Sequence, residues 1–177
     1  MSNTAITNLV SNVGVVSSDV AGVGTARYSP GACEYGEDKG IFGYGNADSN
    51  TAVTNLVSNV GVVSSDVAGV GTARRDLAAC GYGEDKGIFG FGYAASNTAI
   101  TNLVSNVGVV SSNVAGVGTA RYGMGATQYD IDKGIFAYGN NGPSLSMSNL
   151  VSNAGVVSSD VAGVGTIRYY PGACSFN

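Results

Sequence analysis

The side chains that most often perform proton transfer, nucleophilic attack and zinc binding are scarce in this sequence. It contains no histidine, which excludes Ser-His-Asp triads, Cys-His pairs and histidine-containing zinc sites. Its three cysteines, Cys33, Cys80 and Cys174, stand at equivalent places beside an alanine, and a further copy of that place holds Thr127. A small residue there indicates a buried strand position, with a three-thiolate metal site as the alternative. We therefore expect no enzyme activity, no catalytic residue, no cofactor and no metal site.

Charged residues recur in every copy of a repeated pattern instead of gathering at one place. Four arginines end copies of a Gly-Thr-Ala-Arg or Gly-Thr-Ile-Arg motif, at Arg27, Arg74, Arg121 and Arg168. Another repeated place holds Asp19, Asp66 and Asp160, with Asn113 in the third copy. A contact that every copy repeats belongs to the architecture, so we expect the arginines to form ion pairs or backbone hydrogen bonds. The repeated Asp-Lys pairs are expected to be solvated hairpin turns, and no loop has the dense carboxylate alternation of an EF-hand.

The overall charge and the hydropathy pattern exclude two classes of partner. The net charge is -4, and the eight lysines and arginines are dispersed along the chain, so we expect no nucleic-acid partner. No apolar run approaches the roughly 18 residues of a membrane span, and the start of the chain lacks the pattern of a signal peptide. We therefore expect no membrane insertion. Location stays open between the cytoplasm and a virion or other extracellular assembly.

The elements that must position these residues are copies of one unit. The arginine motif returns with a constant spacing of 47 residues, as do Asn-Leu-Val-Ser-Asn and Asp-Lys-Gly-Ile-Phe. We interpret residues 1–177 as a single repeat domain with approximate units 4–50, 51–97, 98–144 and a partial unit 145–177.

Each unit has the pattern of short β-strands. Residues 78–80 lead into a Gly-Glu-Asp-Lys-Gly turn at 83–87, and residues 88–91 follow, which predicts a tight hairpin. Residues 99–104 and 107–110 predict a third and a fourth strand. No segment has the apolar stripe of a helix, and the many Val, Ile and Thr residues favour sheet. The predicted unit is a four-stranded meander.

A four-stranded unit of this length has the size of one blade of a β-propeller. Within it Arg74, residues 78–80, Lys-Gly-Ile-Phe-Gly-Phe-Gly at 86–92 and Thr-Asn-Leu-Val at 101–104 resemble a kelch repeat. The resemblance implies an all-β, propeller-like array of about four four-stranded kelch-type blades. It is similar to repeats of viral and phage structural or fibre proteins, which implies a structural role.

The register of the copies predicts that the last blade is a composite of strands from both ends of the chain. Residues 4–16 correspond to third and fourth strands, and residues 169–176 correspond to a first strand. No copy of Lys-Gly-Ile-Phe-Gly-Tyr-Gly completes this blade, so one strand is missing. Three alternatives remain open: a fragment of a longer array, a gap tolerated in a closed four-blade ring, or a strand supplied by another molecule. The last alternative would produce a homo-oligomer or a filament.

The copies differ mainly after the repeated arginine and after the second strand. In an up-and-down meander these two loops emerge at the same end of the blade. They are rich in Tyr, Asn and Arg, which suit recognition of a protein or carbohydrate ligand. We expect a structural or adhesive scaffold that presents these loops, the alternative being a soluble lectin-like or protein-binding propeller. The candidate binding face comprises Tyr28, Asn46, Asp48, Arg75, Asp76, Tyr93, Tyr122, Met124, Asn140, Asn141, Tyr169 and Tyr170.

Overall fold

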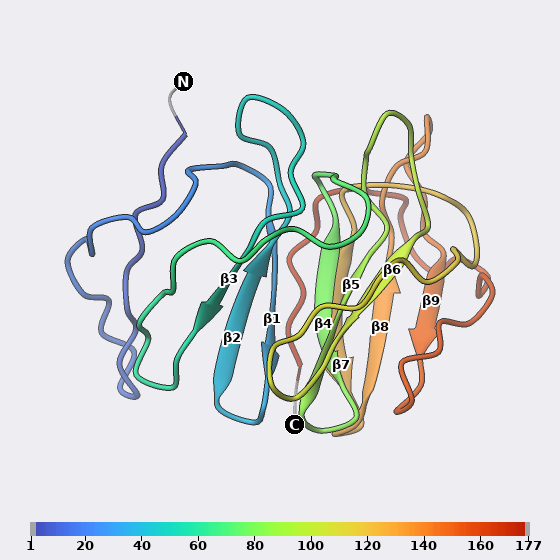
Figure 1. The fold of residues 1–177 in the computed structure, drawn as a ribbon. Coiled ribbons are helices and arrows are strands. Elements are labelled where there is room, and N and C mark those ends of the chain that lie inside the picture. Colours follow the sequence, from blue (N-terminus) through green and yellow to red (C-terminus); the bar gives the residue numbers. More distant parts are fainter. Residues whose placement is uncertain (1–2, 176–177) are drawn as a thin grey trace.

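Three small antiparallel sheets make up the fold of this protein. The computed structural model describes residues 3–175, which contain nine β-strands and no helix (Figure 1). The first sheet contains β1 (Gly31–Tyr35), β2 (Lys39–Gly43) and β3 (Thr54–Val57). The second contains β4 (Ala78–Tyr82), β5 (Lys86–Gly90) and β6 (Thr101–Val104). The third contains β7 (Gly125–Tyr129), β8 (Lys133–Ala137) and β9 (Ser148–Val151).

The register is the same in every sheet, as the repeat requires. In the second sheet, Ile88 of the central strand pairs with Cys80 on one side and with Leu103 on the other. The tight hairpin predicted from the sequence between β4 and β5 turns through Gly83 and Glu84, whose φ angles of 58° and 68° are left-handed. The predicted hairpin and the predicted third strand are thus confirmed.

The predicted fourth strand is wrong as a continuous strand. Residues 107–110 form a turn and reach β6 only through an isolated bridge between Val110 and Val104, with a second bridge between Val114 and Thr101. Because the two residues between these bridges on β6 face three on the opposing segment, regular pairing is interrupted, as in a bulge. The Ser111 hydroxyl also accepts a hydrogen bond from the Leu103 amide at 2.9 Å, which a backbone carbonyl would accept in a ladder. We call residues 105–114 and their copies the fourth segments.

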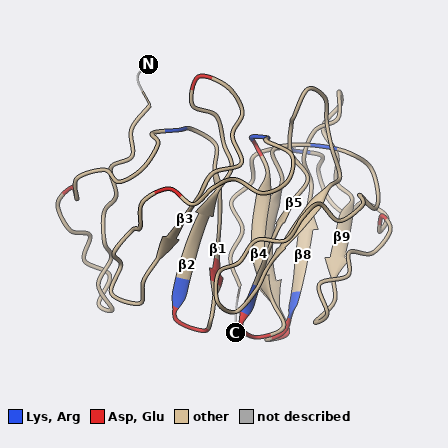
Figure 2. Ribbon diagram, in the orientation of Figure 1, with Lys and Arg blue, Asp and Glu red and all other residues tan. Residues whose placement is uncertain are grey.

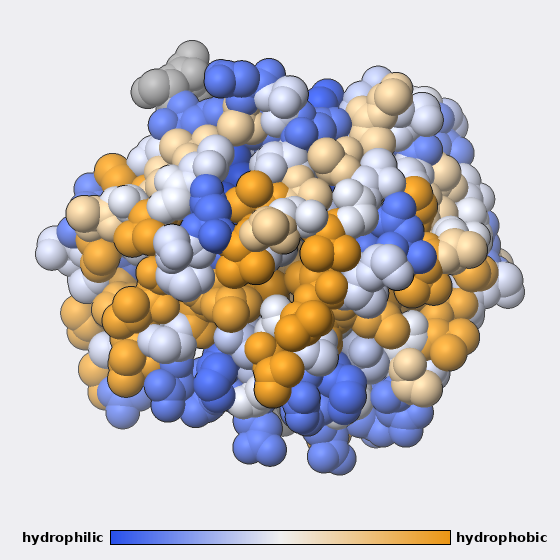
Figure 3. All heavy atoms as spheres, viewed as in Figure 1, coloured by the Kyte–Doolittle hydropathy of each residue, from blue (hydrophilic) through white to orange (hydrophobic). Residues whose placement is uncertain are grey.

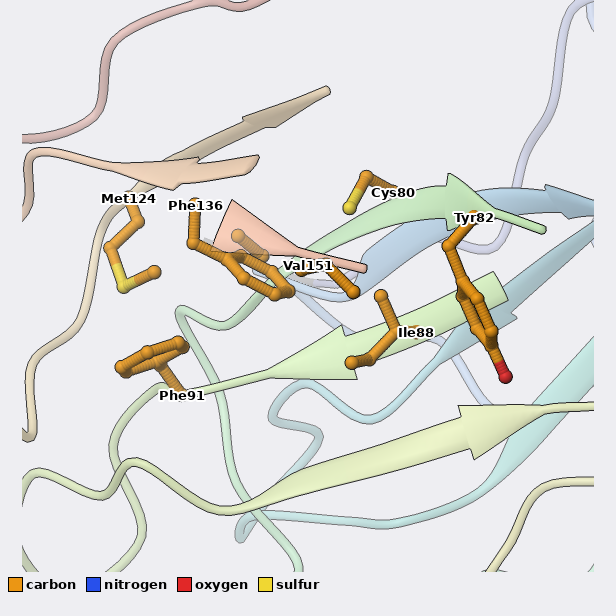
Figure 4. Packing of buried hydrophobic residues seen from close by; sticks show 8 residues of the cluster. Cys80, Tyr82, Ile88, Phe91, Met124, Phe136 and Val151 are labelled. Atoms are coloured by element: carbon orange, nitrogen blue, oxygen red, sulfur yellow. The ribbon is translucent and has the colours of Figure 1, made fainter. Parts of the chain in front are cut away.

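The sheets pack face to face because glycine leaves room for phenylalanine. A Cβ atom on Gly43 would lie 2.7 Å from Cζ of Phe89, and one on Gly90 would lie 2.7 Å from Cζ of Phe136. Phe89 and Phe136 are completely buried at these two interfaces. Figure 4 shows Phe136, Phe91 and Met124 grouped together in this core, and the two rings have their centres 5.3 Å apart. Each glycine of a second strand is therefore a docking position for the next sheet.

Equivalent residues of successive units touch along one line. The Asp76 amide donates to the Ser29 carbonyl at 3.3 Å, the Gly123 amide to the Asp76 carbonyl at 2.9 Å, and the Tyr170 amide to the Gly123 carbonyl at 2.6 Å. These donors and acceptors are 47 residues apart. We call this chain of bonds the inner ladder.

The two ends of the described chain pack on different sheets. Residues 4–20, the N-terminal segment, form bridges between Thr7 and Val20 and between Val10 and Val16, and lie beside the first sheet. Residues 171–173 pack against Gly125 at the start of β7. The first strand predicted at residues 169–176 is not formed over residues 169–175, and Phe176 lies outside the described residues. A strand of this kind needs a second strand for its ladder, and no described strand pairs with these residues.

The all-β class and the repeated antiparallel meander are confirmed, whereas a propeller of four blades is not. The described sheets number three, each has three strands, and they are not closed. The fourth segments leave many valines exposed, among them Val60, Val107 and Val156. Hydrophobic atoms accordingly cover much of the face in Figure 3.

Candidate functional site

The repeated arginine is a structural residue, which removes it from the candidate site. Arg74 is completely buried, and its guanidinium donates to the carbonyls of Phe91 and Thr72 and to Oδ1 of Asn102. It also lies over the Tyr44 ring at 4.2 Å, so it joins two sheets. Arg121 repeats these contacts with the third sheet, and burial lowers its pKa and that of Arg74.

The repeated aspartate is structural as well. Asp66 accepts hydrogen bonds from the amide and the hydroxyl of Thr25 and from the amide group of Asn55, which holds the pKa of its carboxyl below the usual range. In the next copy Oδ1 of Asn113 accepts from the Thr72 amide and Nδ2 of Asn113 donates to the Thr72 hydroxyl, which explains why asparagine is tolerated there. We call the joined arginine, asparagine, threonine and aspartate contacts the inter-unit clasp.

The variable loops lie side by side in each unit, as the alternating strand directions predict. Tyr28 forms an antiparallel bridge with Asn46, Arg75 with Tyr93, and Tyr122 with Asn140. These loops lie at the opposite end of the sheets from the hairpin turns, where the Asp-Lys pairs gather (Figure 2).

Aromatic rings form a continuous row across this face. The Arg75 guanidinium lies 4.8 Å from the centre of the Tyr93 ring, and the Tyr93 and Tyr122 rings meet edge to face at 6.2 Å. Tyr122 continues to Tyr170 at 6.3 Å, and Tyr170 to Tyr169 at 5.2 Å. Tyr169 and Tyr170 are 50% and 57% exposed, so their rings are available to a ligand. We call these residues the tyrosine row.

A hollow of about 160 Å³ opens beside the inner ladder. Every residue that lines it follows a repeated arginine: Ser29, Pro30, Asp76, Leu77, Gly123, Met124 and Tyr170. The ladder residues have φ angles between 49° and 62°, a left-handed conformation that turns each loop inward. Partial burial and the neighbouring Asp76 carboxylate raise the pKa of the Tyr170 hydroxyl. We call this hollow the axial hollow because it lies along the line of the inner ladder. It combines the aromatic ring of Tyr170 with the carboxylate of Asp76.

The predicted face is only partly assembled into this site. Met124, expected on the surface, is instead buried with 7% of its surface exposed, and its side chain packs in the core. Asp48 and Asn141 are exposed in the outer loops and do not line the hollow, while Asn46 and Asn140 are half-buried. Asp76 and Tyr170 are brought together in it.

Sequence reasoning missed two groups of residues at this site. Asn50 was not expected there, yet it accepts from Arg75 at 3.1 Å and donates to the carbonyls of Tyr93 and Ala94. Nothing in the sequence distinguishes it from other loop asparagines. The small and apolar members of the hollow, such as Ser29 and Leu77, were also missed, although they belong to the variable segments. Variation among copies could have found them.

The other polar clusters offer no competing site in the part of the chain that the structure describes. No group of three or more Cys, Asp or Glu residues is placed to hold a metal ion within residues 3–175. Cys80 is buried, which raises its pKa to about 12, whereas Cys174 is exposed. Over the same residues, no helix is long and apolar enough to cross a membrane.

Comparison with models of known protein families and with curated proteins finds no match for this chain. Function must therefore be argued from the contacts of the site itself.

Proposed function

We propose that this chain is a non-enzymatic structural or adhesive repeat scaffold, of a virion, a fibre or another surface assembly, that recognises a ligand through its variable loops. One observation carries the proposal. All residues that line the axial hollow belong to the segments that vary among the copies, while the repeated arginine and aspartate are occupied by the inter-unit clasp. Variation confined to converging loops is typical of binding faces on rigid repeat scaffolds.

A propeller-like arrangement of kelch-type blades is part of this proposal. Sheets that pack face to face lie roughly 10 Å apart. At the inner ladder, however, the equivalent residues of neighbouring units are within hydrogen-bond distance, such as 2.9 Å between Gly123 and Asp76. Sheets that meet along one line and diverge from it favour blades around an axis over a parallel stack. The kelch type is further supported by the sequences of the strands: the motifs that resemble a kelch repeat, at residues 86–92 and 101–104, contain β5 and β6.

A soluble lectin-like or protein-binding propeller is the second candidate. The neighbouring Tyr170 ring and Asp76 carboxylate favour it, because a sugar ring presents an apolar face for stacking and hydroxyls that donate to a carboxylate. The hollow of about 160 Å³ is small, so it would accept one sugar ring or one side chain of a protein ligand.

Glycan and peptide arrays probed with the labelled protein test this function. We expect specific binding that falls about 10-fold in Asp76→Asn and in Tyr170→Ala, since either change removes one polar or aromatic contact. Lys133→Ala, in a hairpin turn at the opposite end, is the matched control and should bind like the parent. Binding that survives both site substitutions in folded protein would refute recognition at the axial hollow.

A further inference from the structure

A second hollow lies between the N-terminal segment and the first sheet. No residue of the tyrosine row lines it. Its volume is about 210 Å³. Apolar walls come from Ile6, Val23 and Phe42, and polar groups from Thr25 and Arg27, among others. Pro30 borders both hollows, whereas the five residues named here do not line the axial hollow.

The complete units show what occupies the equivalent place. There, the second strand of one sheet lies against the next sheet: Gly43 of β2 faces the Phe89 ring. The residue after that glycine, Tyr44, lies beneath the Arg74 guanidinium at 4.2 Å. The pattern repeats at the next interface, where Phe91 lies 4.6 Å beneath Arg121. A strand with a small residue followed by an aromatic residue thus fills each complete interface.

At the first interface, Phe42 and Arg27 occupy the same roles without such a strand. Phe42 is only half-buried, whereas Phe89 and Phe136 are completely buried. In Arg74 and Arg121 the Nε atom donates at 2.8 Å to the carbonyls of Phe91 and Tyr138, which belong to the same unit as the arginine. The Arg27 Nε atom lacks this bond and is buried without a hydrogen-bond partner, so Arg27 is held less completely than its copies.

The adjoining edge of the N-terminal segment is also open. The backbone groups of Thr7 and Leu9 bond to residues 17 and 20 of the same segment. Those of Asn8, which alternate to the other side, make no backbone hydrogen bond within the described chain. Val10 is 66% exposed, while its copies Val104 and Val151 are completely buried beside β5 and β8. The unpaired backbone groups of Asn8 and the exposed side chain of Val10 are those of a strand that lacks a neighbouring strand on this side.

We propose that this hollow binds an extended peptide segment of a partner protein, which adds as a strand along residues 7–10. The chemistry of the segment follows from the three strands that fill the complete interfaces or their equivalents. It is a run of small and apolar residues after a leading lysine, with a small residue that faces Phe42, followed by an aromatic residue whose ring lies beneath Arg27. Addition of a strand to an open sheet edge is an established mode of peptide recognition, in which the backbone supplies affinity and the pockets supply specificity.

A second copy of the chain is a weaker donor than a separate partner. The strands with this composition are β2, β5 and β8, and each is the central strand of its own sheet. To donate one of them, a second copy would have to break two ladders of its own sheet. A free extended segment breaks none. This inference does not depend on the proposed ligand of the axial hollow.

A synthetic peptide that copies residues 85–93 of this chain is the probe, carrying a fluorescent label and titrated into the full chain. We expect saturable binding with one peptide for each chain and a raised thermal midpoint, because a ligand that binds only the folded state stabilises it. A peptide with alanine in place of the phenylalanine copied from Phe91 should bind about 10-fold more weakly, since the ring beneath the guanidinium is lost.

Two protein variants localise the binding. Arg27→Gln should weaken binding of the peptide about 10-fold. Arg168→Gln, near the other end of the chain, should leave the affinity for the peptide unchanged. Absence of saturable binding, or equal binding to Arg27→Gln, would overturn the site. A concentration-dependent dimer that excludes the peptide would overturn the separate partner in favour of a second copy. Tyr170→Ala should bind the peptide as tightly as the parent, because Tyr170 does not line this hollow. A failure of the proposed recognition at the axial hollow can therefore be distinguished from a failure of the proposed peptide site.

Discussion

A buried arginine is the residue on which each complete interface depends, and Arg121 has in addition the Asp160 carboxylate at 3.8 Å. Arg74 is compensated by two carbonyls, by Asn102 and by the Tyr44 ring. Such a charge is stable only while all of its partners are present, because the alternative is an unpaired polar group in the interior.

We therefore predict that Arg74→Ala lowers the free energy of unfolding by ~3 kcal/mol, through the lost bonds and the cavity that remains. Arg168→Ala is the matched variant, because the Arg168 side chain is exposed, donates one hydrogen bond of 3.4 Å to the nearby Thr166 carbonyl and lies 3.8 Å from the centre of the Tyr138 ring, and it should change stability by only ~1 kcal/mol. Urea unfolding of both variants measures the difference. Similar losses in the two variants would contradict the role of the buried clasp.

The clasp aspartate predicts a loss of stability in acid. The folded protein lowers the pKa of Asp66, chiefly through the Thr25 hydroxyl, so the unfolded chain binds its proton more tightly. The resulting stabilisation is present above the unfolded pKa of about 4 and is lost as the pH falls through the folded value.

Asp66→Asn, which copies the natural Asn113, should therefore flatten the decline of the thermal midpoint between about pH 4 and pH 2.5 by ~2 °C. The effect is small because Asp66 is largely exposed. At pH 7 the variant should unfold close to the parent. A steeper decline in acid for the variant would show that another carboxylate governs this range.

At the scale of elements, one difference between the sheets has a direct physical cause. The second strands of the first two sheets have Gly43 and Gly90 where the third sheet has Ala137. Gly43 and Gly90 each face a phenylalanine of the next sheet, whereas β8 has no further sheet against it within the described residues. The glycine is needed only where a ring must approach.

We predict that Gly90→Ala destabilises the protein by ~2 kcal/mol, because its Cβ would lie 2.7 Å from Cζ of Phe136 and the ring would have to shift. Ala137→Gly should cost ~1 kcal/mol or less, through backbone entropy alone. Thermal unfolding compares the two. A Gly90→Ala variant as stable as the parent would mean that the sheets are less tightly packed than the structure shows.

The elements that could be predicted from the sequence are those fixed by local patterns. The hairpin of β4 and β5 and the strand β6 follow from turn glycines and from apolar runs. The fourth segment could not be predicted, since the bond from the Leu103 amide to the Ser111 hydroxyl competes with the ladder and depends on three-dimensional placement. The strand expected at residues 169–176 depends likewise on a partner strand and not on its own composition.

At the scale of the whole molecule, convergence of the variable loops is the property on which the proposed function rests. Alternating strand directions place these loops on one face, and that much could be predicted. Their meeting at the axial hollow depends on the inner ladder, whose bonds join residues 47 positions apart and leave no local sequence signal.

Amide hydrogen exchange of the protein with and without a ligand selected on the arrays tests this convergence most directly. If the ligand occupies the axial hollow, protection should rise at residues 28–30, 75–77, 122–124 and 169–171 together, because all four segments border that hollow. Residues 36–38, 83–85 and 130–132, in the hairpin turns at the opposite end, should exchange as before. Protection confined to those turns, or to a single unit, would contradict the account.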